Sequence, residues 1–408
     1  MKLELDQTVD DKSAWSALAG AGRSGGTHAG NNQAKLRVLH VGKFYPPHMG
    51  GIETHLQALC GALRNHADVR VVVSSEDRNT VEELVDAVPV ARISTLLTAF
   101  STSISPGMVQ RIRHSGAELV HIHLPNPAAV LAYLASGHRG RVIFTYHSDT
   151  VKQKVLGRMF EPLLHAALRK SSAIIATSPN YLATSPVLQA FRDRCHVIPY
   201  GIDTAQFEQC DPEAVRKVRE RYGERLVISV GRLVYYKGFD VLIRAMVSVR
   251  GKLLIVGNGP LRGELESLAA SLGVTDKVVF AGEINNAGVM PYYHASDLFA
   301  LASVARSEAF GIVQIEAMAA GLPVINTSLD SGVPFVSLDS QTGLTVPPGD
   351  PTALAAAINR LLDDDALRQT LGQAGVRRAR QEFSLDTMLR RTLDLYQTVA
   401  ADQGARVR

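Results

Sequence analysis

Short apolar runs alternate along the chain with longer segments of helical periodicity. From residue 35 onward, runs rich in β-branched residues occur at 36–42, 69–75, 118–124, 141–147 and 173–178. Each run leads into a helix or a loop. Strands that are apolar on both faces and alternate with helices are typical of a parallel sheet covered on both sides. The first half of the chain therefore predicts a doubly wound α/β domain.

The same alternation begins again after a charged helix expected over residues 211–224. The second series of predicted strands covers 226–232, 252–258, 277–283, 298–303, 323–328 and 343–348. Two series of this length predict two Rossmann-like domains joined near residues 199–203. Residues 385–400 have helical periodicity beyond the second series, and we expect this helix to pack back across the junction.

We therefore divide the chain into four parts. Residues 1–34, rich in Gly, Ser and Asn, are expected to form a flexible tail. Residues 35–200 and 201–384 form the two Rossmann-like domains, and residues 385–408 form the C-terminal helix, which returns toward the first domain. Ligands of open α/β sheets bind beyond the carboxyl ends of the strands. Two facing sheets therefore predict a binding site in the cleft between them.

Composition narrows the class of protein. With 46% hydrophobic and 20% charged residues in 408, the chain can bury substantial cores, and its net charge of +4 suits either anionic ligands or an ordinary solvated surface. Its three cysteines, Cys60, Cys195 and Cys210, form no CxxC pair, so neither a disulfide framework nor a structural zinc site is indicated. The N-terminus carries acids where a signal peptide would be basic, and no apolar run approaches the roughly 20 residues that span a bilayer. We expect a cytoplasmic protein.

Two predicted strand ends carry residues suited to a phosphate. The stretch HVGKFYPPHMGGIETH places Gly50 and Gly51 at a helix start, which favours either close backbone approach to an anion or a plain tight turn. The stretch SVGRLVYYKGFD places Arg232 and Lys237 around a short loop between a strand and a helix. Both cations can converge there on a diphosphate and stabilise the charge that builds on it as it leaves.

Two other strand ends are less specific. In LLIVGNGPLRG, Asn258 and Gly259 follow a strand, but Pro260 lies between the second and third glycines, which argues against a nicotinamide fingerprint. In FAGEINNAG, Gly282 and Glu283 follow a strand, where a loop could cover a nucleobase.

The stretch EAFGIVQIE carries one carboxylate at each end. We expect Glu308 to lie in a loop and a helix to begin around Phe310 and Gly311, so that the backbone N–H groups of Phe310, Gly311 and Ile312 point at a phosphate. Glu316 would lie more than one helical turn further along. Carboxylates accept hydrogen bonds from vicinal hydroxyls, so one acid can hold a pyranose and the other a ribose on either side of a diphosphate. Surface acids on a helix are the alternative interpretation.

Histidines and one amphipathic segment complete the candidates. His121 and His123 share one face of a strand, but no Asp or Glu completes a set of ligands, so no metal is expected there. His147 lies at the carboxyl end of a strand and is the better candidate for the cleft. Residues 151–170 interleave cations with Leu, Phe and Met at helical spacing, which fits a membrane-surface helix or an ordinary amphipathic core helix.

Together these motifs resemble glycosyltransferase family 4, a large retaining group with the GT-B fold of two doubly wound Rossmann-like domains facing across a cleft. The match runs from about Lys35 to the C-terminal helix, and its most specific part is Glu308, seven intervening residues and then Glu316. The sequences GGIE, GR followed by KG, and GNGP also match.

The resemblance implies roles for individual residues. Arg232 and Lys237 would bind the donor diphosphate, Glu308 the donor sugar and Glu316 the ribose, with His147 near the sugar. It implies a catalytic group of His147, Glu308, Arg232 and Lys237, and Glu53 and His123 on the acceptor side. The implied donor site comprises Gly50, Gly51, Arg232, Lys237, Asn258, Gly259, Gly282, Glu283, Glu308, Phe310, Gly311, Ile312 and Glu316.

The stretches HVGKFYPPHMGGIETH and SEAFGIVQIEAMAAGLPVINT, followed by LDSGVPFVS, are similar to mannosyl- and rhamnosyltransferases of bacterial surface polysaccharide assembly. The resemblance implies a retaining hexosyltransferase that moves a hexose from GDP-mannose or a GDP-deoxyhexose to a glycan linked to a polyprenyl diphosphate, in lipopolysaccharide or exopolysaccharide synthesis. We expect no metal cofactor and no nucleic-acid partner. The inner face of the cytoplasmic membrane is an alternative location.

Three other functions remain open at this point. They are a UDP-sugar-dependent transferase of the same family, a nucleotide-sugar epimerase of similar fold, and a catalytically silent subunit that binds a sugar nucleotide. The presence of both cations and both glutamates argues against the silent subunit.

No carboxylate is placed as a covalent nucleophile. The reaction that the resemblance then implies is front-face attack assisted by the departing diphosphate.

Overall fold

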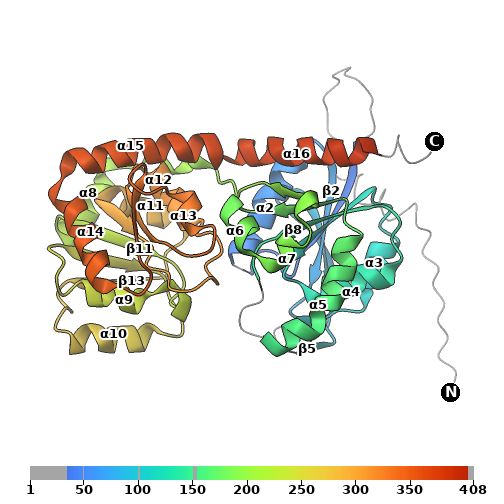
Figure 1. Cartoon of the computed structure of the whole chain (residues 1–408), viewed down its shortest axis with the longest axis horizontal. Coiled ribbons are helices and arrows are strands. Elements are labelled where there is room, and N and C mark those ends of the chain that lie inside the picture. Colours follow the sequence, from blue (N-terminus) through green and yellow to red (C-terminus); the bar gives the residue numbers. More distant parts are fainter. Residues whose placement is uncertain (1–34, 49, 100–101, 150–153, 403–408) are drawn as a thin grey trace.

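A computed structural model of the chain describes residues 35–48, 50–99, 102–149 and 154–402 (Figure 1). The tail predicted over residues 1–34 and the start of the amphipathic segment predicted over 151–170 lie outside the described residues. Two α/β domains stand side by side, as predicted, and two long helices run end to end along one side of both (Figure 1).

The first domain is built on an eight-stranded sheet of order β10-β9-β8-β7-β1-β2-β4-β3, parallel except for β3. All five predicted strands are confirmed. The strands are β1 Arg37–Val41, β2 Asp68–Ser74, β3 Val81–Val85, β4 Val88–Ile93, β7 Leu119–Leu124, β8 Arg141–Tyr146, β9 Ala173–Ala176 and β10 Cys195–Val197. A separate small ribbon pairs β5 Leu97–Ala99 with β6 Thr102–Ile104. The helices are α2 Gly51–Leu63, α3 Gly107–Arg113, α4 Pro127–Ser136, α5 Lys154–Arg169, α6 Pro179–Thr184, α7 Pro186–Gln189 and the 3₁₀ turn η2 Arg192–Arg194.

The second domain has a six-stranded, all-parallel sheet of order β13-β12-β11-β14-β15-β16, which confirms the six predicted strands. They are β11 Leu226–Val230, β12 Lys252–Val256, β13 Val278–Gly282, β14 Leu298–Ala300, β15 Val324–Thr327 and β16 Gly343–Val346. The helices are η3 Thr204–Phe207, α8 Pro212–Tyr222, η4 Tyr235–Lys237, α9 Phe239–Ala245, α10 Arg262–Ser271, α11 Asn286–Ala295, α12 Val313–Ala319, α13 Val333–Val336, α14 Pro351–Asp363 and α15 Asp365–Glu382.

The chain passes between the domains twice, at one place. The Ile202 N–H donates to the Phe383 carbonyl at 2.9 Å, and the Leu385 N–H donates to the Ile202 carbonyl at 2.8 Å. The last helix, α16 Leu385–Ala401, then packs against α2. Its Met388 and Tyr396 are buried in the core of the first domain, so a segment from the end of the chain completes that core.

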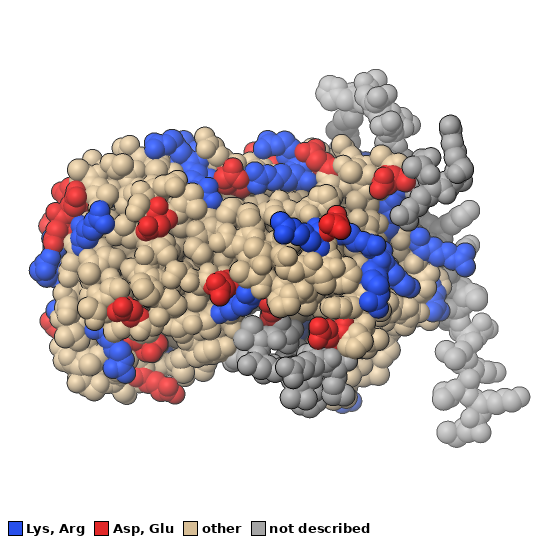
Figure 2. All heavy atoms as spheres, viewed as in Figure 1, with Lys and Arg blue, Asp and Glu red and all other residues tan. Residues whose placement is uncertain are grey.

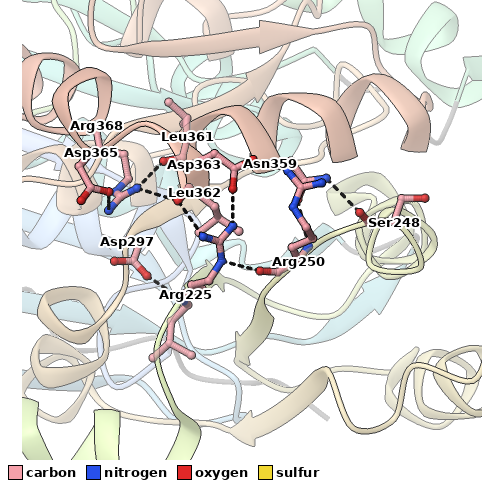
Figure 3. A network of polar contacts seen from close by, with 11 residues as sticks. Arg225, Ser248, Arg250, Asp297, Asn359, Leu361, Leu362, Asp363, Asp365 and Arg368 are labelled. Carbon is pink, nitrogen blue, oxygen red and sulfur yellow. Dashed lines mark hydrogen bonds and ion pairs between the residues drawn. The ribbon is translucent and has the colours of Figure 1, made fainter.

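A polar network ties together the base of the second domain, at the amino ends of its strands (Figure 3). Arg225, which precedes β11, and Arg250, which precedes β12, both contact the carboxylate of Asp363 at the end of α14. The Arg225 Nε also donates to the Arg250 carbonyl at 2.7 Å. These groups are well exposed, so each ion pair contributes little by itself. The network leaves the opposite, carboxyl ends of the strands free for ligand chemistry.

Gly238 fixes the turn that carries Lys237 into α9. Its φ is +67°, and a Cβ at this position would overlap the carbonyl oxygen of Ala302 in the loop after β14. We expect Gly238→Ala to lower the free energy of unfolding by at least about 3 kcal/mol, because left-handed strain adds to a backbone clash. Urea unfolding measures the change. The control is Gly273→Ala, which has φ +68° but no atom within 4 Å, and should cost only about 1 kcal/mol. Equal losses in the two variants would rule out the clash.

Candidate active site

The domains meet where the carboxyl ends of their strands face each other. From the first domain, a Cβ on Gly51 at the start of α2 would stand 4.0 Å from the Ile312 Cδ1 of the second. Across the same junction, the Tyr200 ring packs edge-on against Phe310, with ring centroids 4.8 Å apart. The predicted phosphate loops of both domains therefore lie close together at the domain junction.

An ion pair forms the centre of the site on the second domain. The Nζ of Lys237, at the end of η4, lies 2.6 Å from Oε2 of Glu308 in the loop after β14. Both side chains are about nine-tenths buried, at 12% and 9% exposure. Burial acts to lower the pKa of Lys237, but the charge of Glu308 and its hydrogen bond outweigh burial, and the pKa is raised. Lys237 therefore stays cationic throughout the neutral range.

Glu316 completes this centre from α12. The Tyr293 hydroxyl, on α11, donates to Oε2 of Glu316 at 2.8 Å and orients the carboxylate. Burial raises the pKa of Glu316, against the opposing effects of the Tyr293 hydrogen bond and of the Lys237 charge. One buried cation thus lies in the field of two carboxylates that come from different elements.

The predicted start of the α12 helix is wrong. Gly311 adopts φ +77°, which no α-helical residue can adopt, and the helix begins at Val313. Glu316 therefore lies in the first turn of the helix rather than beyond it. The Phe310 side chain is 2% exposed and belongs to the core. A helix of only seven residues offers a weak dipole.

The remaining predicted donor residues line the strand ends of the second domain. Arg232 is exposed directly after β11. Asn258 is exposed after β12 and caps its own loop, because its Oδ1 accepts from the Gly259 N–H at 2.9 Å. Gly282 adopts φ +80° at the end of β13, and Glu283 beside it is exposed. Their predicted contacts with a donor stay predictions.

On the first domain, Gly50 precedes α2 in an extended conformation with φ −174°, so neither it nor Gly51 needs to be glycine for backbone strain. Gly51 is exposed at the helix start, where the backbone stands open to the cleft. Glu53 is half-buried in the first turn of the same helix. Burial raises the pKa of the Tyr200 phenol, and the charges of Glu308 and Glu53 raise it further.

The predicted histidines belong to a larger buried cluster. His121, His123 and His147 lie with His40 on β1 and His55 on α2, and each is at most 7% exposed. Burial, the largest cause, lowers the pKa of His40 and of His55 to about 3, and lowers the pKa of the other three well below 6.5. All five are therefore neutral near pH 7.

Two histidine trios form within this cluster, His40 with His121 and His123, and His55 with His123 and His147. Within each trio the ligand atoms lie within 4.8 Å of one another. The expectation that no metal binds beside His121 and His123 stays a prediction. The predicted place of His123 on the acceptor side stays a prediction; its side chain is 2% exposed, and both ring nitrogens are hydrogen-bonded to other histidines.

Several residues at the junction were not predicted. Arg306, two residues before Glu308, forms an ion pair with Asp149 of the first domain at 3.0 Å and stacks on Tyr181 at 4.7 Å. The Tyr200 hydroxyl is hydrogen-bonded to His147 Nδ1 at 2.5 Å. The sequence could have indicated the first two, because Asp149 is two residues from His147 and Arg306 two residues from Glu308. No motif near Tyr200 in the sequence indicated its role.

The surface charge and the helices bear on the expectations for a mildly basic chain without membrane-spanning segments. Basic and acidic side chains are interspersed over the face drawn in Figure 2. Among the residues that the structure describes, no helix has the length and apolar character needed to cross a bilayer.

Comparisons with known proteins match both domains. The family model "Glycosyltransferase Family 4" matches residues 49–206, and "Glycosyl transferases group 1" matches residues 211–378. The chain is 32% identical over 368 residues to O-antigen chain mannosyltransferase C of Escherichia coli, covering 89% of this chain and 99% of that protein. It is 32% identical over 353 residues to D-rhamnosyltransferase WbpZ of Pseudomonas aeruginosa, covering 86% and 92%. The solved sucrose-phosphate synthase of Thermosynechococcus elongatus superposes with a TM-score of 0.73 at 25% identity, over 90% of this chain and all of that one.

Proposed function

This chain belongs to the glycosyltransferases of family 4 and group 1, with the GT-B fold, and from that premise we propose that it transfers a mannose- or rhamnose-type hexose from a GDP-sugar to a lipid-linked glycan. Transfer would retain the configuration of the sugar. The names of its relatives, an O-antigen chain mannosyltransferase and a D-rhamnosyltransferase, support this choice of sugar and of product.

The observation that carries the proposal is the buried Lys237 between Glu308 and Glu316. A nucleoside diphosphate sugar presents hydroxyls at both ends and negative charge in the middle. Two carboxylates suit the two hydroxyl-bearing ends, and the cation between them, with Arg232 at the neighbouring strand end, suits the diphosphate. We assign Glu308 to the sugar and Glu316 to the ribose.

The same groups supply the chemistry. As the bond between sugar and diphosphate breaks, negative charge accumulates on the leaving oxygen. A preorganised cation in a dry site stabilises that charge more than it stabilises the ground state. In this proposal Lys237 and Arg232 perform this task without a metal ion, and the acceptor hydroxyl attacks from the face that the diphosphate leaves.

We assign the acceptor to the first domain, beside Glu53 of α2, with Gly50 and Gly51 at the start of that helix toward the donor. Closure of the two domains about the paired crossings at Ile202 and Ser384 would bring that helix start against the donor. A polyprenyl-diphosphate-linked glycan would bring the protein to the inner face of the cytoplasmic membrane.

Thermal shifts with a panel of nucleotides test the donor. A ligand that binds the folded state raises its apparent stability by mass action, so GDP and GDP-mannose should raise the melting temperature more than UDP and UDP-glucose. The reverse order would mean that the donor is a UDP-sugar.

Three further experiments test the reaction. Analysis of the products formed from the donor without acceptor distinguishes a transferase from an epimerase. Transfer that is unchanged in EDTA supports chemistry without a metal. Binding without hydrolysis or transfer to any lipid-linked acceptor would indicate a silent subunit.

Glu316 tests the division between the two acids. We expect Glu316→Gln to weaken GDP binding roughly 10- to 100-fold with a smaller effect on kcat, because hydrogen bonds to a charged partner contribute about 1.5–3 kcal/mol. Isothermal titration measures the dissociation constant. Tyr293→Phe should weaken binding in the same direction, because it removes the hydroxyl that orients Glu316. The control is Glu264→Gln, at an exposed position on α10. If Glu316→Gln slowed transfer but left GDP binding intact, the assignment to ribose would be wrong.

A further inference from the structure

A continuous hydrogen-bonded chain of buried side chains crosses the first domain from α16 to the cleft. Tyr396 of α16 contacts His121 Nδ1 at 2.6 Å and His40 Nε2 at 3.3 Å. From His40, Nδ1 contacts His123 Nε2 at 3.1 Å, and His123 Nδ1 contacts His147 Nε2 at 3.0 Å. The chain ends with His147 Nδ1 at the Tyr200 hydroxyl, 2.5 Å away.

The polarity of this chain follows from the number of protons available. Each histidine in the chain is neutral and carries one N–H, and each of its ring nitrogens makes one contact in the chain, so all the donors must point the same way. At the inner end, Thr145 Oγ1 contacts His121 Nε2 at 2.7 Å. Among the described residues, that histidine is the one partner found for the Thr145 side chain.

The buried hydroxyl of Thr145 decides between the two directions. If the His121 Nε2–H donated to Thr145, the threonine proton would have no acceptor, which costs about 1–3 kcal/mol in a buried site. If Thr145 donates instead, each link follows, and the one proton left over is that of Tyr200, at the domain junction, where an oxygen of a bound substrate can accept it. His121, His40, His123 and His147 then all carry the proton on Nδ1, and the His147 Nδ1–H donates to the Tyr200 oxygen.

In that arrangement the Tyr200 O–H is the one proton that the chain does not use. Tyr200 stands at the domain junction, packed on Phe310 and within the electrostatic field of Glu308 and Glu53. Its hydroxyl is therefore oriented to donate to an oxygen bound in the cleft, either on the sugar nucleotide or on the acceptor.

We propose that Tyr396 is a positioning residue for transfer: through the histidine chain it fixes the tautomer of His147 and turns the Tyr200 hydroxyl outward as a hydrogen-bond donor to the substrates. The proposal rests on the proposed function for the identity of those substrates. It adds to the site a residue of α16, which follows the second domain in the sequence but packs in the core of the first. Direct substrate contact belongs to Tyr200, and Tyr396 acts through the histidines.

Tyr396→Phe tests the proposal, since it keeps the buried ring and removes only the hydroxyl that joins His121 to His40. We expect kcat for transfer to fall roughly 10- to 100-fold, the size of effect caused by small misplacements of a working group, with the donor KM little changed. Tyr200→Phe should produce a loss at least as large. The control is Tyr133→Phe, which removes another largely buried tyrosine hydroxyl from the same domain but outside the chain.

Nitrogen NMR of the labelled histidine rings provides a readout that does not depend on activity. Wild-type protein should show His40, His121, His123 and His147 as Nδ1–H tautomers. In Tyr396→Phe, each of these four histidines should show a mixture of Nδ1–H and Nε2–H tautomers. An Nε2–H tautomer at any of the four in the wild type would overturn the polarity. Stoichiometric metal in the purified protein, measured by mass spectrometry, would overturn the chain itself, because a ligating nitrogen cannot also accept a hydrogen bond.

The two proposals fail in different ways. If the wild type shows the four Nδ1–H tautomers but transfers no sugar, the proposed function is wrong and the chain stands. If the wild type transfers sugar and Tyr396→Phe does so at the same kcat, the positioning role is wrong and the proposed function stands.

Discussion

Replacing Lys237 by alanine is expected to reduce kcat for sugar transfer by roughly 10²- to 10³-fold, the loss that follows when one preorganised charge-stabilising group is removed. The substitution removes the buried cation and leaves the Glu308 carboxylate without its partner at 2.6 Å. Breaking a buried pair in this way also destabilises the fold, by about 3–5 kcal/mol. Initial rates with GDP-mannose and urea unfolding measure the two losses separately.

A double substitution separates the role of Lys237 in stability from its role in catalysis. Lys237→Met with Glu308→Gln removes both charges, so we expect most of the stability to return while the activity does not. Lys217→Ala, which removes an exposed lysine on α8, serves as the control. If the double variant regained transfer together with stability, Lys237 would be a structural residue and the assignment to the diphosphate would fail.

Acid is expected to destabilise the first domain steeply below about pH 6.5. The five clustered histidines have folded-state pKa values lowered by burial, to about 3 for His40 and His55. The unfolded chain binds a proton on each histidine near pH 6.5, but the folded chain does not. Their contribution to stability is therefore complete above pH 6.5 and is lost as the pH falls. Below the unfolded pKa, each such histidine lowers the free energy of unfolding by about 1.4 kcal/mol per pH unit, so the five together lower it by about 7 kcal/mol per unit.

Urea unfolding between about pH 7.5 and 5.5 measures this slope as an uptake of protons. His55→Leu should flatten the slope by about one proton, since His55 lies outside the hydrogen-bonded chain and its Nδ1 has no partner among the described residues. His66→Leu, at an exposed position, is the control for losing an imidazole. A stability that stays level down to about pH 5.5 would mean that the cluster takes up protons while folded.

The sequence predicted the parts of the fold whose signals are local. Each central strand reads as an apolar run because helices cover both of its faces. Two of the strands that were missed lack such runs. The edge strand β3 has the sequence VEELV and is mostly exposed, and β10 is only three residues long. For the same reason, the antiparallel pairing of β3 with β4 could not be read from local pattern.

The grouping of Lys237 with Glu308 and Glu316 was predictable for a similar reason. Arg232, Lys237, Glu308 and Glu316 each stand at a fixed offset from a strand end, and parallel strands bring their ends together. The start of α12 was misplaced because glycine is compatible both with a helix and with φ +77°, and sequence alone does not choose between them.

The histidine chain could not have been predicted in this way. Its members come from β1, β7 and β8, from the residue after β8 and, with Tyr396, from α16, so 356 residues separate the partners His40 and Tyr396. Only the packing of α16 back onto the first domain brings them together. A pattern within one window of sequence carries no information about such a contact.

The place of α16 in the first domain has a consequence for biosynthesis. Residues 203–383 of the second domain are contiguous, so that domain can fold as soon as they leave the ribosome. The first domain is made earlier, yet Met388, Leu395, Tyr396 and Val399 of its core are synthesised only after the whole second domain. Until α16 arrives, the nascent first domain exposes an apolar face of α2, and His121 Nδ1 and His40 Nε2 lack their tyrosine partner. The domain that is translated first is thus completed only after the second domain has been made, and a chain released before α16 would lack the tyrosine that joins His121 to His40.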